Sequence, residues 1–199
     1  MVEACIKKRR NIDGGFGGKV KFQPCMNTVT SSMPTKQRRY PLKNKEAKQI
    51  LTEASANLKL DMEKLFGSKA TVEVAESEVG SIYLIEGKPV LFKSGNKVLP
   101  TLHFTEYIIS APKIVVDMGA VPYVCKGATV MAPGIVRIEG NFAKGDLVVV
   151  TDVKFGKTLG LGESLLDVET AKQTKKGPVV KTLHFVSDKI WDYTKTLIE

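Results

Sequence analysis

The second half of the sequence, from Lys113 to Val186, consists of short apolar runs separated by glycine and proline. The strand-like runs lie at residues 114–116, 127–131, 147–150, 158–161, 179–180 and 183–186. Short runs at this close spacing, bounded by turn residues, are typical of small all-β units. The pattern therefore predicts a small β-barrel.

Two helices are expected beside these strands. Asp117 can cap a short helix, which Pro122 limits to one or two turns because proline lacks an amide hydrogen. After the last strand, Ser187 or Asp188 can cap a terminal helix that carries Trp191.

The first half mixes helical and strand patterns. Asn44 is a candidate N-cap, and apolar residues follow it at helical spacing: Ala47, Ile50, Leu51, Ala54 and Leu58. A second helix is expected between Asp61, as its cap, and Gly67. Strand runs follow at residues 70–75, 81–85 and 90–92, with turns at 86–88 and 94–96 and a short helix at 101–107. We therefore expect a small α/β unit that ends near Pro112.

Positive charge is concentrated at the start of the chain. The sequence has 30 Lys and Arg against 21 Asp and Glu, a formal net charge of +9. Residues 1–45 hold 11 of the bases and two of the acids, so residues 46–199 have 19 of each and sum to zero. Basic proteins often bind phosphate, but residues 46–199 would have to do so through a local patch.

Residues 1–32 contain two glycine pairs and show neither helical nor strand periodicity, which is typical of a flexible segment. Three interpretations stay open. The segment is a basic tail that binds nucleic acid, a solvated tail, or translated sequence upstream of a true start at Met33.

The composition indicates a soluble globular protein. No run approaches the roughly 18 apolar residues of a membrane span, since the best one, Ile114–Val124, contains Asp117. Basic residues 7–10 are not followed by an apolar segment, so no signal peptide is predicted. The cysteines are odd in number and form neither a metal-ligand spacing nor a disulfide framework. We expect a cytoplasmic location and no membrane partner.

An ordered series of glycine-containing motifs runs through the second half of the chain. Its members are Asp117-Met118-Gly119-Ala120, Val124-Cys125-Lys126-Gly127-Ala128, Met131-Ala132-Pro133-Gly134-Ile135, Gly145-Asp146 and Gly160-Leu161-Gly162. The series resembles the PUA domain, an RNA-binding module named after pseudouridine synthases and archaeosine transglycosylases. The physical logic agrees, because glycine permits positive φ and close backbone approach.

A narrower resemblance rests on residues at both ends of this series. They are Leu99-Pro100-Thr101-Leu102, Lys176-Gly177, Leu183-His184-Phe185, Asp188 and Trp191. These residues are similar to the family named for malignant T-cell amplified sequence one, which has archaeal members. The resemblance implies an α+β fold, with a small N-terminal α/β (pre-PUA) domain at 33–112, a C-terminal PUA β-barrel at 113–188 and a C-terminal helix at 189–199. Residues 1–32 fall outside it, as a flexible basic tail or a mis-assigned start.

RNA generally lies along one face of a PUA domain, built from the short helix, the following loop and nearby strands. The resemblance therefore implies RNA-binding positions at Lys126, Gly127, Ala128, Thr129, Met131, Pro133 and Gly134. Arg137 lies just beyond and can bind a phosphate or stack on a base. Lys154 and Lys157 flank Phe155 at a predicted hairpin turn. If exposed, Phe155 can stack on a base; the alternative, that it folds back onto a neighbouring strand, stays open.

Signatures of catalysis are missing from the sequence. Neither histidine, His103 or His184, has a patterned partner for a metal site or a nucleophile–base pair. We interpret His184 as a structural or a surface histidine, Cys125 as a small buried residue and Asp117 as a helix cap. The run Gly156-Lys157-Thr158 lacks the first glycine of a phosphate-binding loop. We expect no catalytic residue, no metal, no cofactor and no enzymatic activity.

The leading hypothesis is a noncatalytic RNA-binding protein, a translation initiation or recycling factor that contacts tRNA or small-subunit rRNA through its PUA domain. The family resemblance implies the small ribosomal subunit as a partner, together with a protein similar to density-regulated protein. The alternative is an accessory protein that presents tRNA or rRNA to a separate transglycosylase or pseudouridine synthase.

Overall fold

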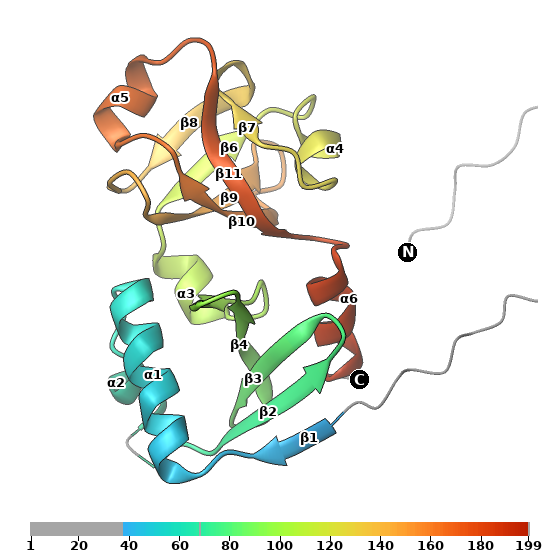
Figure 1. Ribbon diagram of the computed structural model, residues 1–199. Helices are drawn as coiled ribbons and strands as arrows, with labels where there is room; N and C mark the ends of the chain where they lie inside the picture. The colour runs from blue at the N-terminus through green and yellow to red at the C-terminus, as the bar shows by residue number, and fades with distance from the viewer. Residues whose placement is uncertain (1–37, 68, 199) are drawn as a thin grey trace, which may run out of the picture. The chain divides into compact units, whose positions relative to one another are not determined.

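The computed structural model describes residues 38–67 and 69–198 (Figure 1), all within one compact unit. Residues 1–32, with their three interpretations, lie outside the described residues. The described residues begin with an antiparallel sheet and three helices. A curled sheet with short helices follows, and a further helix comes last.

The first sheet has the strand order β1-β2-β3-β4-β5. Its strands are β1 (Arg38–Pro41), β2 (Val72–Ser77), β3 (Gly80–Ile85), β4 (Lys88–Ser94) and β5 (Lys97–Pro100). The helices of this part are α1 (Asn44–Leu58), α2 (Met62–Phe66) and α3 (Thr105–Ser110). The two helices expected on either side of Leu60 are therefore confirmed, as is the cap of the second, because the Asp61 carboxylate accepts a hydrogen bond from the Lys64 amide at 3.0 Å.

Helix α1 buries the apolar stripe that its sequence predicts. The buried residues are Ala47, Leu51, Ala54 and Leu58, three or four positions apart. The expected N-cap was wrong, because Asn44 is already the first helical residue and Lys43 is the N-cap. Glu46 in the first turn accepts the Lys43 amide at 3.4 Å, which satisfies the donor that the cap leaves free.

The first sheet is covered on both faces, and the alternation of β3 shows how. Tyr83 and Ile85 share a buried cluster with the apolar stripe of α1. Ile82 and Leu84 point the other way and share a cluster with Tyr193 of α6 (Lys189–Thr196). The last helix of the chain therefore closes the outer face of the first sheet (Figure 1).

The second sheet has the strand order β7-β11-β10-β9-β6-β8. Its strands are β6 (Lys113–Val116), β7 (Val130–Met131), β8 (Ile135–Glu139), β9 (Leu147–Asp152), β10 (Thr158–Ser164) and β11 (Pro178–Phe185). Between them lie α4 (Val121–Val124), the 3₁₀ turn η1 (Ala132–Gly134) and α5 (Val168–Gln173). The sheet curls around an aliphatic core that includes Ile114, Val116, Val148, Val150 and Val180. The expected α+β class, a small α/β part followed by a curled β-sheet, is confirmed.

Several elements differ from the expected pattern. The runs at 179–180 and 183–186 are one strand, β11, because Lys181 and Thr182 between them also pair with β10. The register of this pairing shifts directly after Thr182. Helix α3 begins at Thr105 and not at Thr101, since the Thr101 amide donates to the Val90 carbonyl at 2.9 Å and so continues the pairing of β5 with β4. The sequence patterns do not predict β1, β5, β8 or α5, which are all short.

Strand β10 has no room for side chains at two positions. A Cβ atom at Gly162 would lie 2.3 Å from Val180 Cγ1 and 2.8 Å from the Lys181 carbonyl oxygen. At Gly160 it would lie 2.8 Å from the His184 carbonyl oxygen. The Gly160-Leu161-Gly162 motif therefore lets β10 and β11 approach closely, and its role is packing.

His184 on β11 joins the two sheets. Its side chain is fully buried, and its ring meets Phe92 of β4 edge-on, with ring centroids 5.2 Å apart. His184 Nδ1 lies 2.7 Å from a carboxylate oxygen of Asp188, which also accepts the amides of Phe185 at 3.0 Å and Trp191 at 2.7 Å. Of the two interpretations of His184, the structural one is correct, and of the two candidate caps of the last helix, Asp188 is the N-cap. One carboxylate therefore ties β11 to α6.

Replacing Asp188 by alanine should lower the free energy of unfolding by about 2 kcal/mol, because α6 loses its cap and the buried His184 loses a partner. Urea denaturation of the full chain at pH 7, followed by circular dichroism, measures the difference. Asp192→Ala, within the first turn of the same helix, is the matched control and should cost less.

The same variant has an expected pH dependence. Burial opposes the charge on Asp188, but the hydrogen bonds from His184 and from the Trp191 and Phe185 amides outweigh it, so the pKa of this carboxyl lies below its usual range. A carboxyl group of this kind stabilises the fold above its unfolded-state pKa of about 3.9, and the contribution is lost as the pH falls through the folded-state pKa. The difference between wild type and Asp188→Ala should therefore shrink below about pH 4. A constant difference would contradict the assignment.

Candidate nucleic-acid interface

The first candidate surface is a groove beside α4. Asp117 Oδ1 accepts the Ala120 amide at 2.7 Å, so Asp117 caps the turn ahead of α4, while Ala120 is the N-cap of the helix itself. The groove has a volume of about 320 Å³. Its mostly apolar lining consists of Ala120, Tyr123, Val124, Ala128, Thr129, Val130, Met131 and Gly134.

Most residues expected from the sequence at this face lie at this groove. Ala128, Thr129, Met131 and Gly134 line it, Pro133 lies in η1, and Lys126 follows α4 with its side chain exposed. Thr182 Oγ1 donates to the Ala128 carbonyl at 2.7 Å and so fixes the loop to β11.

Gly127 is required in this loop by its conformation. Its φ is +79°, and a Cβ atom there would lie 2.6 Å from the Phe185 ring. Any side chain would therefore combine an unfavourable backbone conformation with a clash. The glycine lets the chain turn from α4 into the groove wall.

Tyr123 is a groove residue that sequence reasoning missed. Its side chain is 68% exposed, although it stands in an apolar run. The helical spacing indicates this exposure, because Val121 and Val124 lie on the helix face that packs against the barrel core and Tyr123 lies on a different face. An exposed aromatic next to an apolar groove can contact a base or a sugar.

The second candidate surface is the hairpin between β9 and β10. Phe155 at its tip is 63% exposed, so the interpretation in which the ring folds back onto a strand was wrong. The ammonium groups of Lys154 and Lys157 lie 5.2 and 5.7 Å from the ring centroid. Both are close enough for cation–π attraction.

Asp152 holds this hairpin in shape. It is buried at the end of β9, and its carboxylate accepts the amides of Phe155 at 2.5 Å and Lys157 at 2.9 Å. The Phe155 amide lowers the pKa of Asp152 against the opposing effect of burial, and the Lys157 amide adds to this lowering. The tip is therefore organised by its own backbone before any ligand arrives.

Arg137 does not lie in the α4 groove. It belongs to a second groove of about 360 Å³, shared with Lys113 and with Gly156 and Thr158 of the hairpin. Arg137 Nε donates to Glu139 at 2.5 Å. The structure thus divides the expected RNA-binding residues into one set at α4 and another at the β9–β10 hairpin.

The two sets meet at the end of β6. The Val153 amide donates to the Val116 carbonyl at 3.0 Å, and the Asp117 amide donates to the Gly134 carbonyl at 2.9 Å. The hairpin and the groove wall are therefore attached to adjacent residues, Val116 at the end of β6 and Asp117 directly after it. Whether these residues bind RNA stays a prediction.

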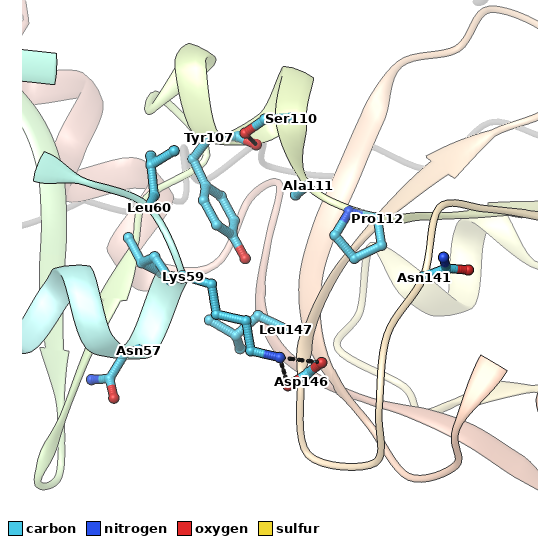
Figure 2. Close-up of a pocket in the computed structure, with 11 residues that line it drawn as sticks. Asn57, Lys59, Leu60, Tyr107, Ser110, Ala111, Pro112, Asn141, Asp146 and Leu147 are labelled. Carbon is cyan, nitrogen blue, oxygen red and sulfur yellow. Dashed lines mark hydrogen bonds and ion pairs between the residues drawn. The ribbon is translucent and has the colours of Figure 1, made fainter. Parts of the chain in front are cut away.

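A further pocket of about 220 Å³ lies between α1, α3 and the start of β9 (Figure 2). Figure 2 shows Lys59 reaching Asp146, and Lys59 Nζ donates to both carboxylate oxygens at 2.8 and 2.7 Å. Burial raises the pKa of Tyr107 beside them, and the charge of Asp146 adds to the effect. The pocket offers an ion pair and a neutral phenol but no nucleophile with an adjacent base, so we interpret it as a structural joint.

Within the described residues, no three His, Cys, Asp or Glu side chains gather as a metal-binding group. His103 stacks on Trp191 with centroids 4.6 Å apart, and burial lowers its pKa. Cys125 is only half-buried, so the expectation of a buried thiol was wrong. The part of the chain that the structure covers has no helix long and apolar enough to cross a bilayer.

Two family models match the chain in the order that the fold shows. The PUA domain model matches residues 112–186, and a model described as a domain of unknown function (DUF1947) matches residues 38–107. The "Uncharacterized protein MJ1432" of Methanocaldococcus jannaschii is 35% identical over 160 residues, which cover 79% of this chain and 97% of that protein. This chain belongs to the family of PUA-domain proteins that carry DUF1947 ahead of the PUA domain.

The family assignment confirms the resemblance to a PUA protein with a pre-PUA domain. The PUA domain is an RNA-binding domain, so the coarse functional expectation holds. The domain boundaries expected from the sequence stay a prediction.

Members with a pre-PUA domain have relatives in eukaryotes. Translation machinery-associated protein 20 of Saccharomyces cerevisiae is 25% identical over 141 residues, which cover 67% of this chain and 78% of that protein. A solved structure, "hypothetical protein PH0734.1" of Pyrococcus horikoshii OT3, is 32% identical with a TM-score of 0.66, covering 79% of this chain and 99% of that one.

The PUA domain alone is shared with a class of enzymes. The "Probable tRNA pseudouridine synthase B" of Pyrobaculum arsenaticum is 45% identical over 71 residues, which cover 36% of this chain but only 21% of that protein. The similarity is thus high but confined to about a fifth of the synthase.

Proposed function

We propose that this protein is a noncatalytic translation factor that binds structured RNA, either tRNA or small-subunit rRNA, through its PUA domain. The similarity to translation machinery-associated protein 20 carries the proposal, because that alignment extends well beyond the PUA domain. A shared two-domain arrangement is stronger support for a shared role than a shared module, since modules are reused across functions.

The RNA surface in this proposal is centred on the α4 groove. Lys126 supplies a positive charge at the exposed end of α4, and Gly127 lets the loop turn against the Phe185 ring into the groove wall. Tyr123 and Met131 offer exposed apolar surface to a base or a sugar. Phosphate contacts would position the RNA, and the groove would select its shape.

The pre-PUA domain then serves as the docking part. In this proposal it contacts the small ribosomal subunit or a protein partner similar to density-regulated protein, in the cytoplasm. Because residues 46–199 have no net charge, docking and RNA binding both need specific surfaces.

Sedimentation tests the proposal directly. The purified full chain is mixed with archaeal small ribosomal subunits at low salt and separated on a sucrose gradient. Co-migration with the small subunit is expected, with large subunits as the specificity control. Protein that stays at the top of the gradient in both mixtures would contradict the proposal.

A second candidate function is supported by the higher identity to the pseudouridine synthase B proteins. In this alternative the chain presents tRNA or rRNA to a separate modification enzyme. Affinity purification from cells distinguishes the two, because a modification enzyme without ribosomal components would favour the alternative. Ribosomal proteins in the eluate would favour the translation factor.

A further inference from the structure

The tip of the β9–β10 hairpin presents an aromatic ring that takes no part in the apolar packing of the described residues. The Phe155 ring is exposed and belongs to none of the buried clusters of the described residues. Its backbone is nevertheless held by the Asp152 carboxylate, and the Gly156 amide donates to the Asp152 carbonyl at 3.2 Å. A ring on a rigid backbone loses little conformational freedom when a ligand covers it.

The cations around this ring are free to bind an anion. Neither Lys154 nor Lys157 forms an ion pair with a carboxylate among the residues that the structure covers. Their ammonium groups stay within 5.2 and 5.7 Å of the ring centroid. An aromatic face between two unpaired lysines matches a nucleotide, whose base stacks while its flanking phosphates meet the cations.

The groove beside the hairpin continues this surface towards α3. Lys113 and Arg137 line it together with Gly156 of the tip. Arg137 uses Nε for Glu139, which leaves the terminal guanidinium nitrogens for a phosphate. A strand that leaves the tip in this direction meets two more cations, in a groove that Glu139 and Asp152 also line.

We propose that the hairpin tip is a stacking site for an unpaired RNA base, with Phe155 as the platform and the Lys113–Arg137 groove as the track for the adjoining backbone. The inference rests on the proposed RNA-binding function. It adds the class of ligand, an unpaired base, at a surface separate from the α4 groove. The base must be unpaired, because both faces of a base inside a helix are already stacked. The ligand class is therefore a single-stranded segment, a loop or a strand end.

Substitution of Phe155 by leucine tests the stacking. Leucine keeps an apolar side chain of similar reach but has no π face, so binding of a fluorescein-labelled short single-stranded RNA by the full chain should weaken by about 5- to 150-fold. Phe155→Trp should bind at least as tightly as wild type. Both variants should keep the wild-type melting temperature, since the ring is exposed. The same RNA annealed to its complement should bind wild type and Phe155→Leu alike.

A spectroscopic readout separates stacking from mere apolar contact. A 2-aminopurine base in the oligonucleotide should lose fluorescence on binding wild type and Phe155→Trp and keep it with Phe155→Leu. Equal affinities for wild type and Phe155→Leu, or no quenching with wild type, would overturn the inference.

The failure of the inference can be told apart from the failure of the proposed function. If tRNA binds wild type and is lost in Tyr123→Ala, while the Phe155 variants bind single strands like wild type, the α4 surface stands and the stacking site does not. If wild type binds neither single strands, nor tRNA, nor small ribosomal subunits, both fall.

Discussion

Reversing the charges of Lys126 and Arg137 together should weaken the binding of tRNA by about 100-fold at low salt, since each phosphate contact is worth about tenfold. Lys126 stands at the α4 groove and Arg137 in the groove beside the hairpin, so the pair samples both candidate surfaces. Both side chains are exposed, and the Lys126→Glu, Arg137→Glu variant should therefore fold normally.

The salt dependence of the same variant provides a second measurement. With four or five phosphate contacts, the logarithm of the wild-type affinity should fall against the logarithm of salt concentration with a slope of roughly −3 to −4. Loss of two contacts should make the slope shallower by about 1.5. Fluorescence anisotropy over a salt series measures both quantities.

The matched control is Lys45→Glu with Lys48→Glu on α1, which changes the net charge equally at exposed positions of the other domain. The Lys45→Glu, Lys48→Glu variant should keep most of the wild-type affinity for tRNA. An equal loss in both double variants would mean that binding follows the overall charge, and the proposed surfaces would be wrong. The single variants then show whether one surface or both bind the RNA.

Replacing Gly162 by valine should lower the free energy of unfolding by about 3 kcal/mol or more, the largest effect on stability that we expect. The added Cβ would lie 2.3 Å from Val180 Cγ1 and 2.8 Å from the backbone oxygen of Lys181. The Val180 side chain is buried, and the Lys181 oxygen belongs to the neighbouring strand, so neither can move without opening β10 from β11.

Gly87→Ala is the control for this substitution. Gly87 has a φ of +78° in a turn of the first sheet, with nothing within 4 Å of the added Cβ. Gly87→Ala should lower the free energy of unfolding by only about 1–2 kcal/mol, because alanine must adopt the left-handed conformation but meets no clash. Guanidinium denaturation of both variants measures the difference. Equal costs would show that β10 relaxes around the new side chain, and the packing role of the glycine motif would be wrong.

Features that depend on neighbours in the chain could be predicted from the sequence. The apolar stripe of α1, the caps at Asp61 and Asp188 and the turn at Phe155 all follow from interactions over a few residues. The expected N-cap of α1 was wrong by one residue, because the Lys43 amide donates to Glu46 and Asn44 is already helical. Short strands such as β1 and β5 carry too few residues for their periodicity to show.

Features that depend on distant residues could not be predicted in this way. The exposure of Phe155 stayed open, because a hairpin tip can turn its ring to either side. Proximity in the sequence groups Arg137 with Lys126, but the pairing of β8 with β6 places Arg137 in the groove beside the hairpin. Register decides the side of a strand residue, and register is set by the partner strand.

The sequence by itself determined the two-part α+β organisation, the PUA resemblance and the neutral balance of residues 46–199, because periodicity, motif spacing and charge are properties of the chain. Only the tertiary structure decided that α6 closes the first sheet, that His184 is buried against Phe92, and that the expected RNA-binding residues form two surfaces meeting at β6. The physical reason is that burial and proximity arise from packing between segments far apart in the sequence, which no local pattern records.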